Sequence, residues 1–452
     1  MMINSVNLRE LVLDMLNEVT EKKGFSHVVL KKTLSKYQYL KKQERSFITK
    51  VMEGTVENII QIDYIINAFS KTKVNKMKPV IRNILRMGVY EIFYMDSVPD
   101  SATCNEAVKL AIKRGFSGLK GFVNGVLRNI AREKENIKYP NPSENLVEYL
   151  NVKYSMPEWI IEQLFVQYGV EEASRIIEGF SKRYEYLTVR CGIMCQVEKL
   201  MEELKNEGIE VKKNPWYEYA IDIKDYDYLG KIAAFNEGRM NVQDVSSMLV
   251  AHVAEPKADA FCVDLCAAPG GKSIHLGELL KGSGKVIARD VSEYKLELID
   301  DNIERCGLKN VETDLKDATV LDEELIGKAD VVIADLPCSG LGVIGKKSDI
   351  KYNMTPEKQD ELVKIQRQIL SNAWQYLKPD GVMIYSTCTI NKAENIENLK
   401  WLLEEFPLET MDISQYFAEE NRVSSMKDGY IQMLPGINHT DGFFISKLKK
   451  KG

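Results

Sequence analysis

Residues 264–273 read DLCAAPGGKS, an apolar strand end that runs directly into a pair of glycines. The stretch closes the first of several short apolar segments, which lie at 261–265, 286–290, 311–313, 331–335 and 382–386. Helical patterns separate most of them, at 274–280, 295–306 and 358–376. Strands of this kind predict an α/β doubly wound, Rossmann-like parallel sheet that is buried on both faces. Because such sheets bind ligands at the carboxyl ends of their strands, the residues after each strand are the candidates for function.

The first two strand ends carry groups that suit a nucleoside. Gly270 and Gly271 let the backbone turn sharply and approach a ligand closely, and Pro269 stiffens the loop before them. The exposed amides of the helix that follows suit a polar or anionic group. Asp290 ends the next strand, where its carboxylate can accept hydrogen bonds from ribose hydroxyls. Together these features predict a nucleoside-containing cofactor.

A second glycine cluster, residues 340–345, matches the dinucleotide fingerprint G-x-G-x-x-G letter for letter. The residues after it do not open a helix at once, and no acid-tipped strand follows some 20 residues later, as the fingerprint requires. We therefore interpret these glycines as a flexible loop on the substrate side and not as a nicotinamide or flavin site.

Two cysteines lie just past the ends of neighbouring predicted strands. Cys338 stands in DLPCSG, three residues after Asp335, and Cys388 stands in YSTCT. A free cysteine is most often a small buried hydrophobe, as we expect for Cys262. The turn-rich positions of Cys338 and Cys388 instead predict two thiols that face one cleft.

Two thiols, a carboxylate and a nucleoside cofactor suit methylation at carbon 5 of a cytosine. A thiolate that adds to carbon 6 makes carbon 5 nucleophilic, and a carboxyl group at ring nitrogen 3 assists the addition. A base then removes the carbon 5 proton so that the thiol can leave. This is covalent catalysis followed by general-base elimination.

The composition is that of a globular chain of several domains. Hydrophobic residues make up 44% and charged residues 28%, which excludes collagen-like and mainly disordered chains. No apolar run reaches membrane-spanning length, and Arg9, Glu10 and Asp14 make the N-terminal pattern an amphipathic helix and not a signal peptide. Eight scattered cysteines without a CxxC pair, and only four histidines, favour reduced thiols, a cytoplasmic location and no metal.

The pattern divides the chain into three expected domains: 1–138, 145–235 and 236–452. The first is predicted to be a bundle of six or seven helices, and the second is predicted to be a small mixed α/β module after a linker at 138–145. Residues 1–140 carry 24 Lys or Arg against 14 Asp or Glu, a net charge of +10, while the whole chain has −5. The basic front predicts an anionic partner, although a merely solvated basic face would look the same.

At these residues the sequence resembles the RsmB/Sun family of ribosomal RNA cytosine-5 methyltransferases, which use S-adenosylmethionine. The motifs that carry the resemblance are NVQDVSS (241–247), DLCAAPGGK (264–272), Asp290, KDAT with Asp317, DLPCSGLGV (335–343), YSTCT (385–389) and the closing PGINHTDGFFISKLKK (435–450). The front is similar to the RNA-binding antitermination factor NusB, in 44–63, 80–99, 105–113 and 120–130. Residues 145–235 stand where the family has a small RNA-binding module.

The resemblance implies a role for each site residue. Cys388 would be the nucleophile, Cys338 would assist release, and Asp335 would be the carboxyl group. The cofactor-binding residues that it implies are Cys266, Ala267, Ala268, Pro269, Gly270, Gly271, Lys272, Asp290, Asp317 and Asp335. It also implies small-subunit (16S) ribosomal RNA as the substrate. We expect the target base to be extruded from its stack, because it must reach a buried thiol, and we expect the protein to be a monomer.

Some features depart from the family pattern, and two other functions stay open. Lys346 and Lys347 stand where relatives often carry an Arg pair, Leu336 replaces a commoner Ala, and Arg289 is unusual. DNA enzymes use a Pro-Cys nucleophile, whereas a chain with both a Pro-Cys and a Thr-Cys site looks like the RNA type. The alternatives are methylation of another substrate, such as tRNA or protein, and a non-catalytic rRNA-binding assembly factor.

Overall fold

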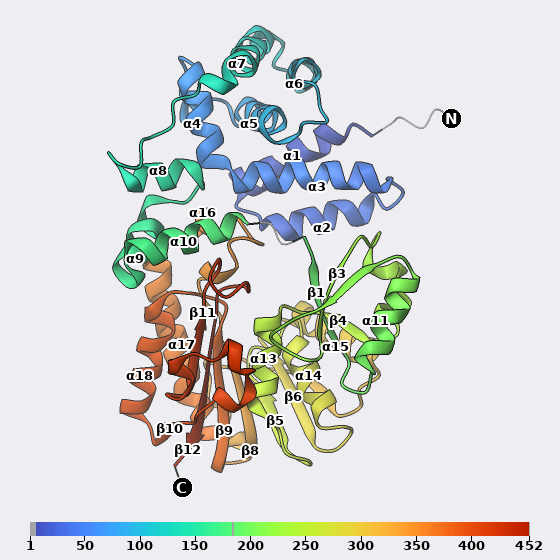
Figure 1. Ribbon diagram of the computed structural model, residues 1–452, viewed down its shortest axis with the longest axis vertical. Helices are drawn as coiled ribbons and strands as arrows, with labels where there is room; N and C mark the ends of the chain where they lie inside the picture. Colours follow the sequence, from blue (N-terminus) through green and yellow to red (C-terminus); the bar gives the residue numbers. More distant parts are fainter. Residues whose placement is uncertain (1–5, 183–184, 452) are drawn as a thin grey trace. The chain divides into compact units, whose positions relative to one another are not determined.

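The computed structural model describes residues 6–182 and 185–451, so residues 1–5 of the N-terminal pattern lie outside the described part. The chain forms two compact units (Figure 1). Unit 1 contains the residues up to 181 together with 344–353, and unit 2 contains 182–343 and the residues from 354 onward. This division does not coincide with the three expected domains, whose boundaries stay a prediction.

Unit 1 is helical, as the sequence predicts. Its α-helices in the described residues are α1 (Leu8–Lys22), α2 (Ser26–Lys36), α3 (Lys42–Glu57), α4 (Ile59–Phe69), α5 (Pro79–Tyr94), α6 (Asp100–Lys113), α7 (Lys120–Glu133), α8 (Leu146–Lys153), α9 (Glu158–Tyr168), α10 (Val170–Ser181) and α16 (Ile350–Asn353). The seven from α1 to α7 form the bundle that was expected before residue 138. None of the described helices of the chain is long and apolar enough to cross a membrane.

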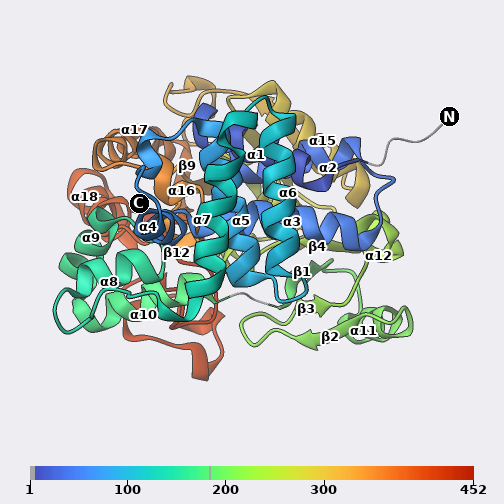
Figure 2. The same cartoon turned by 90° about the horizontal axis from the view of Figure 1, so that it is seen from above.

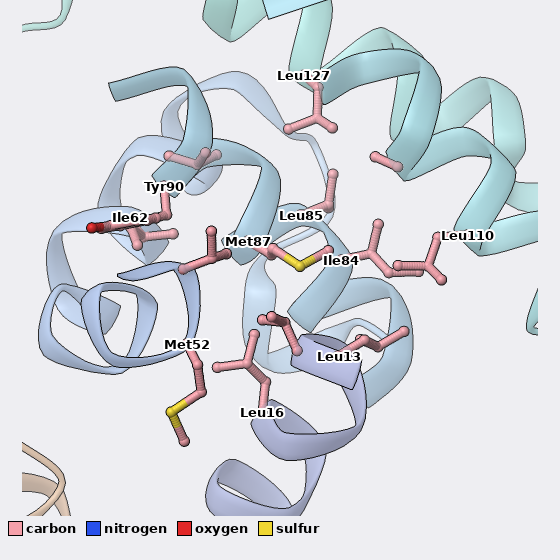
Figure 3. Packing of buried hydrophobic residues seen from close by; sticks show 14 of the residues in the cluster. Leu13, Leu16, Met52, Ile62, Ile84, Leu85, Met87, Tyr90, Leu110 and Leu127 are labelled. Carbon is pink, nitrogen blue, oxygen red and sulfur yellow. The ribbon is translucent and has the colours of Figure 1, made fainter. Parts of the chain in front are cut away.

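Helix α5 forms the centre of the bundle, where it packs against α1, α3, α4, α6 and α7 (Figure 2). A helix that is apolar on nearly all sides must be enclosed, and Ile84, Leu85 and Met87 are fully or almost fully buried among the side chains of Figure 3. The buried Glu91 accepts hydrogen bonds from Arg9 at 2.7 Å and from Thr103 at 3.0 Å. These charge-assisted bonds offset the cost of burying its carboxylate.

Residues 344–353 belong to unit 1 although both flanking segments belong to unit 2. Lys351 is 3% exposed and donates to the carbonyl of Glu57 at 2.9 Å. Glu57 is the last residue of α3, so the lysine satisfies a carbonyl that the helix leaves open and lies at the negative end of the helix dipole. The Tyr352 hydroxyl donates to the same carbonyl at 3.1 Å, and Ser26 donates to the buried Asp349. The segment is therefore anchored inside unit 1.

Unit 2 contains the expected doubly wound sheet, in the order β10-β12-β9-β8-β5-β6-β7, with β11 paired to β12. The strands are β5 (Phe261–Asp264), β6 (Lys285–Asp290), β7 (Val311–Leu315), β8 (Ala329–Asp335), β9 (Leu377–Thr387), β10 (Leu408–Thr410), β11 (Tyr430–Met433) and β12 (Phe443–Lys450). Strands β5 to β9 run parallel, and β12 pairs antiparallel to β9. All five strands predicted from the apolar segments are confirmed; β10 and β11 were not expected.

Helices cover both faces of this sheet. They are α13 (Val245–Ala254), α14 (Gly271–Leu279) and α15 (Glu293–Cys306) on one face, and α17 (Pro356–Tyr376) and α18 (Ile396–Glu405) on the other. Alternate residues of β8 point to the two faces: Val331 and Ile333 join the first core, Val332 and Ala334 the second. The unbroken apolar pattern of the strands reflects this two-sided burial.

A second, antiparallel sheet in the order β2-β3-β1-β4 precedes the large one. Its elements are β1 (Leu187–Cys191), α11 (Val197–Asn206), β2 (Glu210–Lys213), β3 (Ala220–Lys224), α12 (Ala233–Asn236) and β4 (Met240–Val242). Arg190 on β1 is fully buried, pairs with Glu278 of α14, and donates to Gln243 at 2.9 Å. A buried ion pair is tolerated only when such additional hydrogen bonds satisfy it, so this pair ties the small sheet firmly to α14.

Candidate active site at the carboxyl ends of β8 and β9

The two predicted cysteines meet where β8 and β9 end. The strands are parallel neighbours in which Asp335 is opposite Ser386, so the chain leaves both strands at the same level. The Sγ atoms of Cys338 and Cys388 lie 3.4 Å apart, and both residues are partly exposed. The two thiols are therefore neighbours at the carboxyl ends of these strands, and the cleft that they are expected to face stays a prediction.

A buried glutamate that sequence reasoning missed holds the loop of Cys338. Glu394 is fully buried and accepts from the Ser339 amide at 2.8 Å and from the Gln366 amide group at 3.0 Å. Asn391 donates to its other oxygen at 3.1 Å, and the Ser339 hydroxyl also bonds to Thr389 at 2.7 Å. Because Thr389 follows Cys388 directly, this network fixes the two cysteine loops relative to each other.

The second glycine cluster is packed tightly beside the cysteines. The Gly342 amide donates to the Cys388 carbonyl at 3.1 Å, and the Gly342 carbonyl accepts from Gly442 at 2.9 Å. A Cβ on Gly342 would lie 1.9 Å from the Gly442 carbonyl oxygen. The interpretation of residues 340–345 as a flexible loop is therefore wrong at Gly342, which is glycine because two backbone segments approach it.

Two features of its surroundings change the pKa of Cys338. The hydrogen bond with Cys388 and burial raise the pKa of Cys338 well above the ordinary value of a cysteine. Cys338 therefore stays protonated at neutral pH.

A lysine of the glycine-rich turn reaches the end of β8. Lys272 Nζ lies 2.7 Å from Asp335, which also accepts from the Ser386 hydroxyl at 2.8 Å. Burial lowers the pKa of Lys272, but Asp335, Asp264 and Cys388 together oppose this effect, and the pKa is raised overall. The ammonium group therefore stays charged between the turn and the two thiols.

The turn itself has the shape expected of a ligand-binding loop. Gly270 has φ +97°, a left-handed conformation that glycine adopts without strain, and α14 starts at the next residue. The Ala268 amide lies 3.4 Å from the carboxylate of Asp290, which is only 4% exposed at the end of β6. Lys295 lies 3.2 Å from the same carboxylate. The predicted turn and the predicted acid are thus in contact.

A cavity of about 320 Å³ opens beside the ends of β6 and β7. Its lining includes Asp317, which accepts from the Thr319 hydroxyl at 2.7 Å, and Arg289. Arg289 forms ion pairs with Asp314 at 2.8 Å and with Asp322 at 2.6 Å. These two pairs explain the unusual arginine at this position, which the sequence alone did not explain. The cavity therefore lies beside the end of the strand that carries Asp290.

Asp264 is a further buried acid next to this loop. Its side chain is fully buried at the end of β5 and accepts from the Ser273 hydroxyl at 2.6 Å. Burial raises its pKa to about 7. Burial raises the pKa of the Cys266 thiol, two residues later, above its ordinary value.

Comparison with known proteins places the chain in a family. The protein of Bacillus subtilis named "Probable ribosomal RNA small subunit methyltransferase B" is 35% identical over 456 residues that span all of both chains. The family described as 16S rRNA methyltransferase RsmB/F matches residues 251–449, and the NusB family matches 6–132. The chain belongs to the RsmB/F family of rRNA methyltransferases. The expected family, and the NusB-like helical front, are thereby confirmed.

One further curated protein and two solved structures are similar to the chain. The ribosomal RNA small subunit methyltransferase B of Klebsiella pneumoniae strain 342 is 28% identical and is also covered over its full length. The crystal structure of PH0851 matches 99% of both chains with a TM-score of 0.83 and 27% identity. NSun6 from Pyrococcus horikoshii, solved with SFG, shares the fold over 66% of this RsmB/F chain and 98% of its own, with a TM-score of 0.58 and 24% identity.

Proposed function

We propose that this RsmB/F-family chain transfers a methyl group from S-adenosylmethionine to carbon 5 of a cytosine in small-subunit (16S) ribosomal RNA, through a covalent adduct with Cys388. The observation that carries the proposal is the 3.4 Å approach of the Cys338 and Cys388 thiols at the ends of β8 and β9. A thiolate nucleophile and a second thiol beside it are what addition to carbon 6 and later release require.

The chain's groups would act in sequence. Cys388 forms a bond from Sγ to carbon 6, and the electrons displaced toward the ring make carbon 5 nucleophilic. S-adenosylmethionine, when bound, supplies the electrophilic sulfonium methyl. After methyl transfer, the carbon 5 proton passes to solvent water, and the electron pair of its C–H bond re-forms the double bond between carbons 5 and 6. The bond between Sγ and carbon 6 breaks in the same step and leaves Cys388 as a thiolate, and the protonated Cys338 assists this release by donating a hydrogen bond to the departing sulfur. Each covalent bond to the enzyme is thus formed and broken once.

The charged groups at the site have matching roles in this proposal. Asp335 meets the edge of the base that bears ring nitrogen 3, where negative charge develops during addition. A lone carboxylate would oppose that charge, so the Lys272 ammonium, 2.7 Å from Asp335, is the group that makes the position favourable.

The cofactor fits the groups at the ends of β5, β6 and β7. Asp290 would hold the ribose hydroxyls, because its buried carboxylate lies beside the turn. The turn from Cys266 to Lys272 would enclose the methionine part, and the cavity beside Asp317 would take the adenine. We place the reaction in the cytoplasm, on rRNA held through the basic NusB-like region.

A denaturing gel tests the proposal. Cys338→Ala protein, incubated with unmodified rRNA and S-adenosylmethionine, should accumulate a protein–RNA band that survives denaturation, because addition proceeds and release is impaired. Cys195→Ala, a partly exposed thiol outside the site, is the matched control and should give no band. A band from Cys388→Ala instead would reverse the two roles.

The same assay separates the alternatives. Methyl acceptance by purified rRNA, tRNA and protein fractions identifies the substrate class. No band from either cysteine variant, together with rRNA binding that is intact, would overturn the catalytic proposal in favour of an assembly factor.

A further inference from the structure

A cavity of about 380 Å³ lies in unit 1, away from the cysteines and the cofactor residues in the sequence. It is lined by Gln61 of α4, Phe93 and Tyr94 of α5, Tyr139 after α7, and Tyr149 and Lys153 of α8. Four of these six side chains are aromatic, and Lys153 is the one charged group among them. The volume is within the range of small-ligand sites.

Two tyrosines of the lining are held in fixed orientations by a second ring. Tyr139 stacks on Tyr64 with ring centroids 6.2 Å apart and planes at 17°, and Tyr94 stacks on Tyr90 at 5.0 Å and 17°. Tyr94 and Tyr139 nevertheless remain 44% and 42% exposed. A preoriented, exposed aromatic ring is a platform that loses little entropy when a further flat ring stacks on it.

The cation of the cavity is also held in place. Lys153 Nζ donates to the Tyr149 hydroxyl at 2.6 Å and lies 5.0 Å from the centre of the same ring. The hydrogen bond to Tyr149 raises the pKa of Lys153, so the group remains an ammonium. Aromatic faces beside a fixed cation suit a ligand that joins a flat ring to an anion.

We propose that this cavity binds an unpaired nucleobase of RNA, stacked on Tyr94 or Tyr139, with the adjoining phosphate at Lys153. The net charge of +10 on residues 1–140 favours a polyanion over a peptide that carries an aromatic side chain. The proposal rests on the proposed function in that RNA is the substrate, and it adds a second base-binding site that holds RNA apart from the nucleotide to be methylated.

Equilibrium binding of the full-length chain to RNA tests the site. The probes are unmodified 16S rRNA and a short single-stranded oligoadenylate, without S-adenosylmethionine. At least one of the variants Tyr139→Leu and Tyr94→Leu, the one that removes the stacking ring, should weaken binding of the oligonucleotide about tenfold, the usual loss for one stacked base. Tyr139→Phe keeps the ring and should bind as the unaltered chain does. Lys153→Gln should make the RNA affinity less dependent on salt concentration, by the amount expected for the loss of about one phosphate contact.

Tyr39→Leu is the matched control, because Tyr39 is 67% exposed in unit 1 and is not part of the lining. A duplex of the same oligonucleotide should bind the Tyr variants and the unaltered chain equally, since its bases are already stacked. Unchanged oligonucleotide affinity in both Tyr→Leu variants would overturn the site, as would an equal loss in Tyr39→Leu. These binding measurements do not depend on methyl transfer. They therefore test the base-binding site even if the denaturing gel shows no covalent protein–RNA adduct.

Discussion

Glu394 accepts a hydrogen bond from the backbone amide of Ser339 at 2.8 Å, although 55 residues separate the two. One carboxylate thereby joins the loop that carries Cys338 to the loop that carries Cys388. The geometry of the two thiols depends on this acid, which is fully buried.

Replacement of Glu394 should therefore damage both stability and activity. Glu394→Ala leaves the donors of Ser339, Gln366 and Asn391 without their acceptor, which we expect to cost about 3 kcal/mol of the free energy of unfolding. Glu394→Gln keeps one acceptor oxygen and should cost less. Urea unfolding and methyl incorporation measure the two effects. Glu397→Ala, at an exposed position three residues on, should change neither; an equally stable Glu394→Ala would contradict the role.

Gly342→Ala should reduce methyl transfer with a smaller effect on cofactor binding. The added Cβ meets the Gly442 carbonyl oxygen at 1.9 Å and the Cys388 carbonyl oxygen at 2.8 Å, so one of these segments must move. Displacement of a nucleophile by about 1 Å costs roughly 100-fold in rate. Rate measurements at saturating cofactor test this. Gly125→Ala, where nothing lies within 4 Å of the new Cβ, is the control, and a full rate in Gly342→Ala would refute the prediction.

Asp264 should make the stability of unit 2 depend on pH. Its pKa is raised from 3.8 to about 7, so the folded state binds the proton more tightly than the unfolded state does. The raised pKa of Asp264 adds to the free energy of unfolding. This stabilisation is fully present below pH 3.8 and is lost as the pH rises through about 7. Asp264→Asn keeps an acceptor for Ser273 without the charge.

The Asn variant should gain stability relative to the unaltered chain as pH rises from about 4 to about 8, by up to about 4 kcal/mol. Thermal melts across this range measure the difference. Asp412→Asn is the control, because the pKa of its exposed carboxylate is lowered by the hydrogen bond from Ser414. This substitution should change the pH dependence of stability with the opposite sign, and at lower pH. A flat difference for Asp264→Asn would show that the carboxylate is ionised in the folded chain.

Asp290→Ala should weaken S-adenosylmethionine binding about 100-fold, the loss expected for two hydrogen bonds to a carboxylate. Calorimetric titration measures the affinity directly, without RNA. Asp301→Ala, on an exposed position of α15, should leave it unchanged. If Asp290→Ala keeps its affinity for S-adenosylmethionine, Asp290 does not bind the ribose.

The sequence predicted the features that depend on local pattern. Buried strands show as apolar runs, so β5 to β9 could be predicted, and parallel neighbours necessarily end at one edge, so Cys338 and Cys388 could be brought together. The outer strands β10 and β11 are short and half polar, and they resemble loops. Their assignment depends on pairing with β12, which no local pattern shows.

The polar networks could not be predicted, because their partners are distant in the chain. Glu394 lies in a run of polar residues and reads as a surface acid until Ser339 and Gln366 are placed around it. Arg289 looked unusual because its partners, Asp314 and Asp322, follow on later segments. In both cases the side chain's role is fixed by tertiary contacts alone.

Because residues 344–353 are anchored in unit 1, the chain cannot be divided into two fragments that each contain one complete unit. The polypeptide passes from one unit to the other at 181/182, 343/344 and 353/354, so no single cut separates them. A fragment without α2 and α3 would strand Asp349 and Lys351, two buried charged residues, without the partners they have on Ser26 and Glu57. The N-terminal helical region therefore cannot be exchanged on its own. A helical region from another protein would also need matching residues at positions 344–353, within the sequence of unit 2, so the two parts must be inherited and re-engineered together.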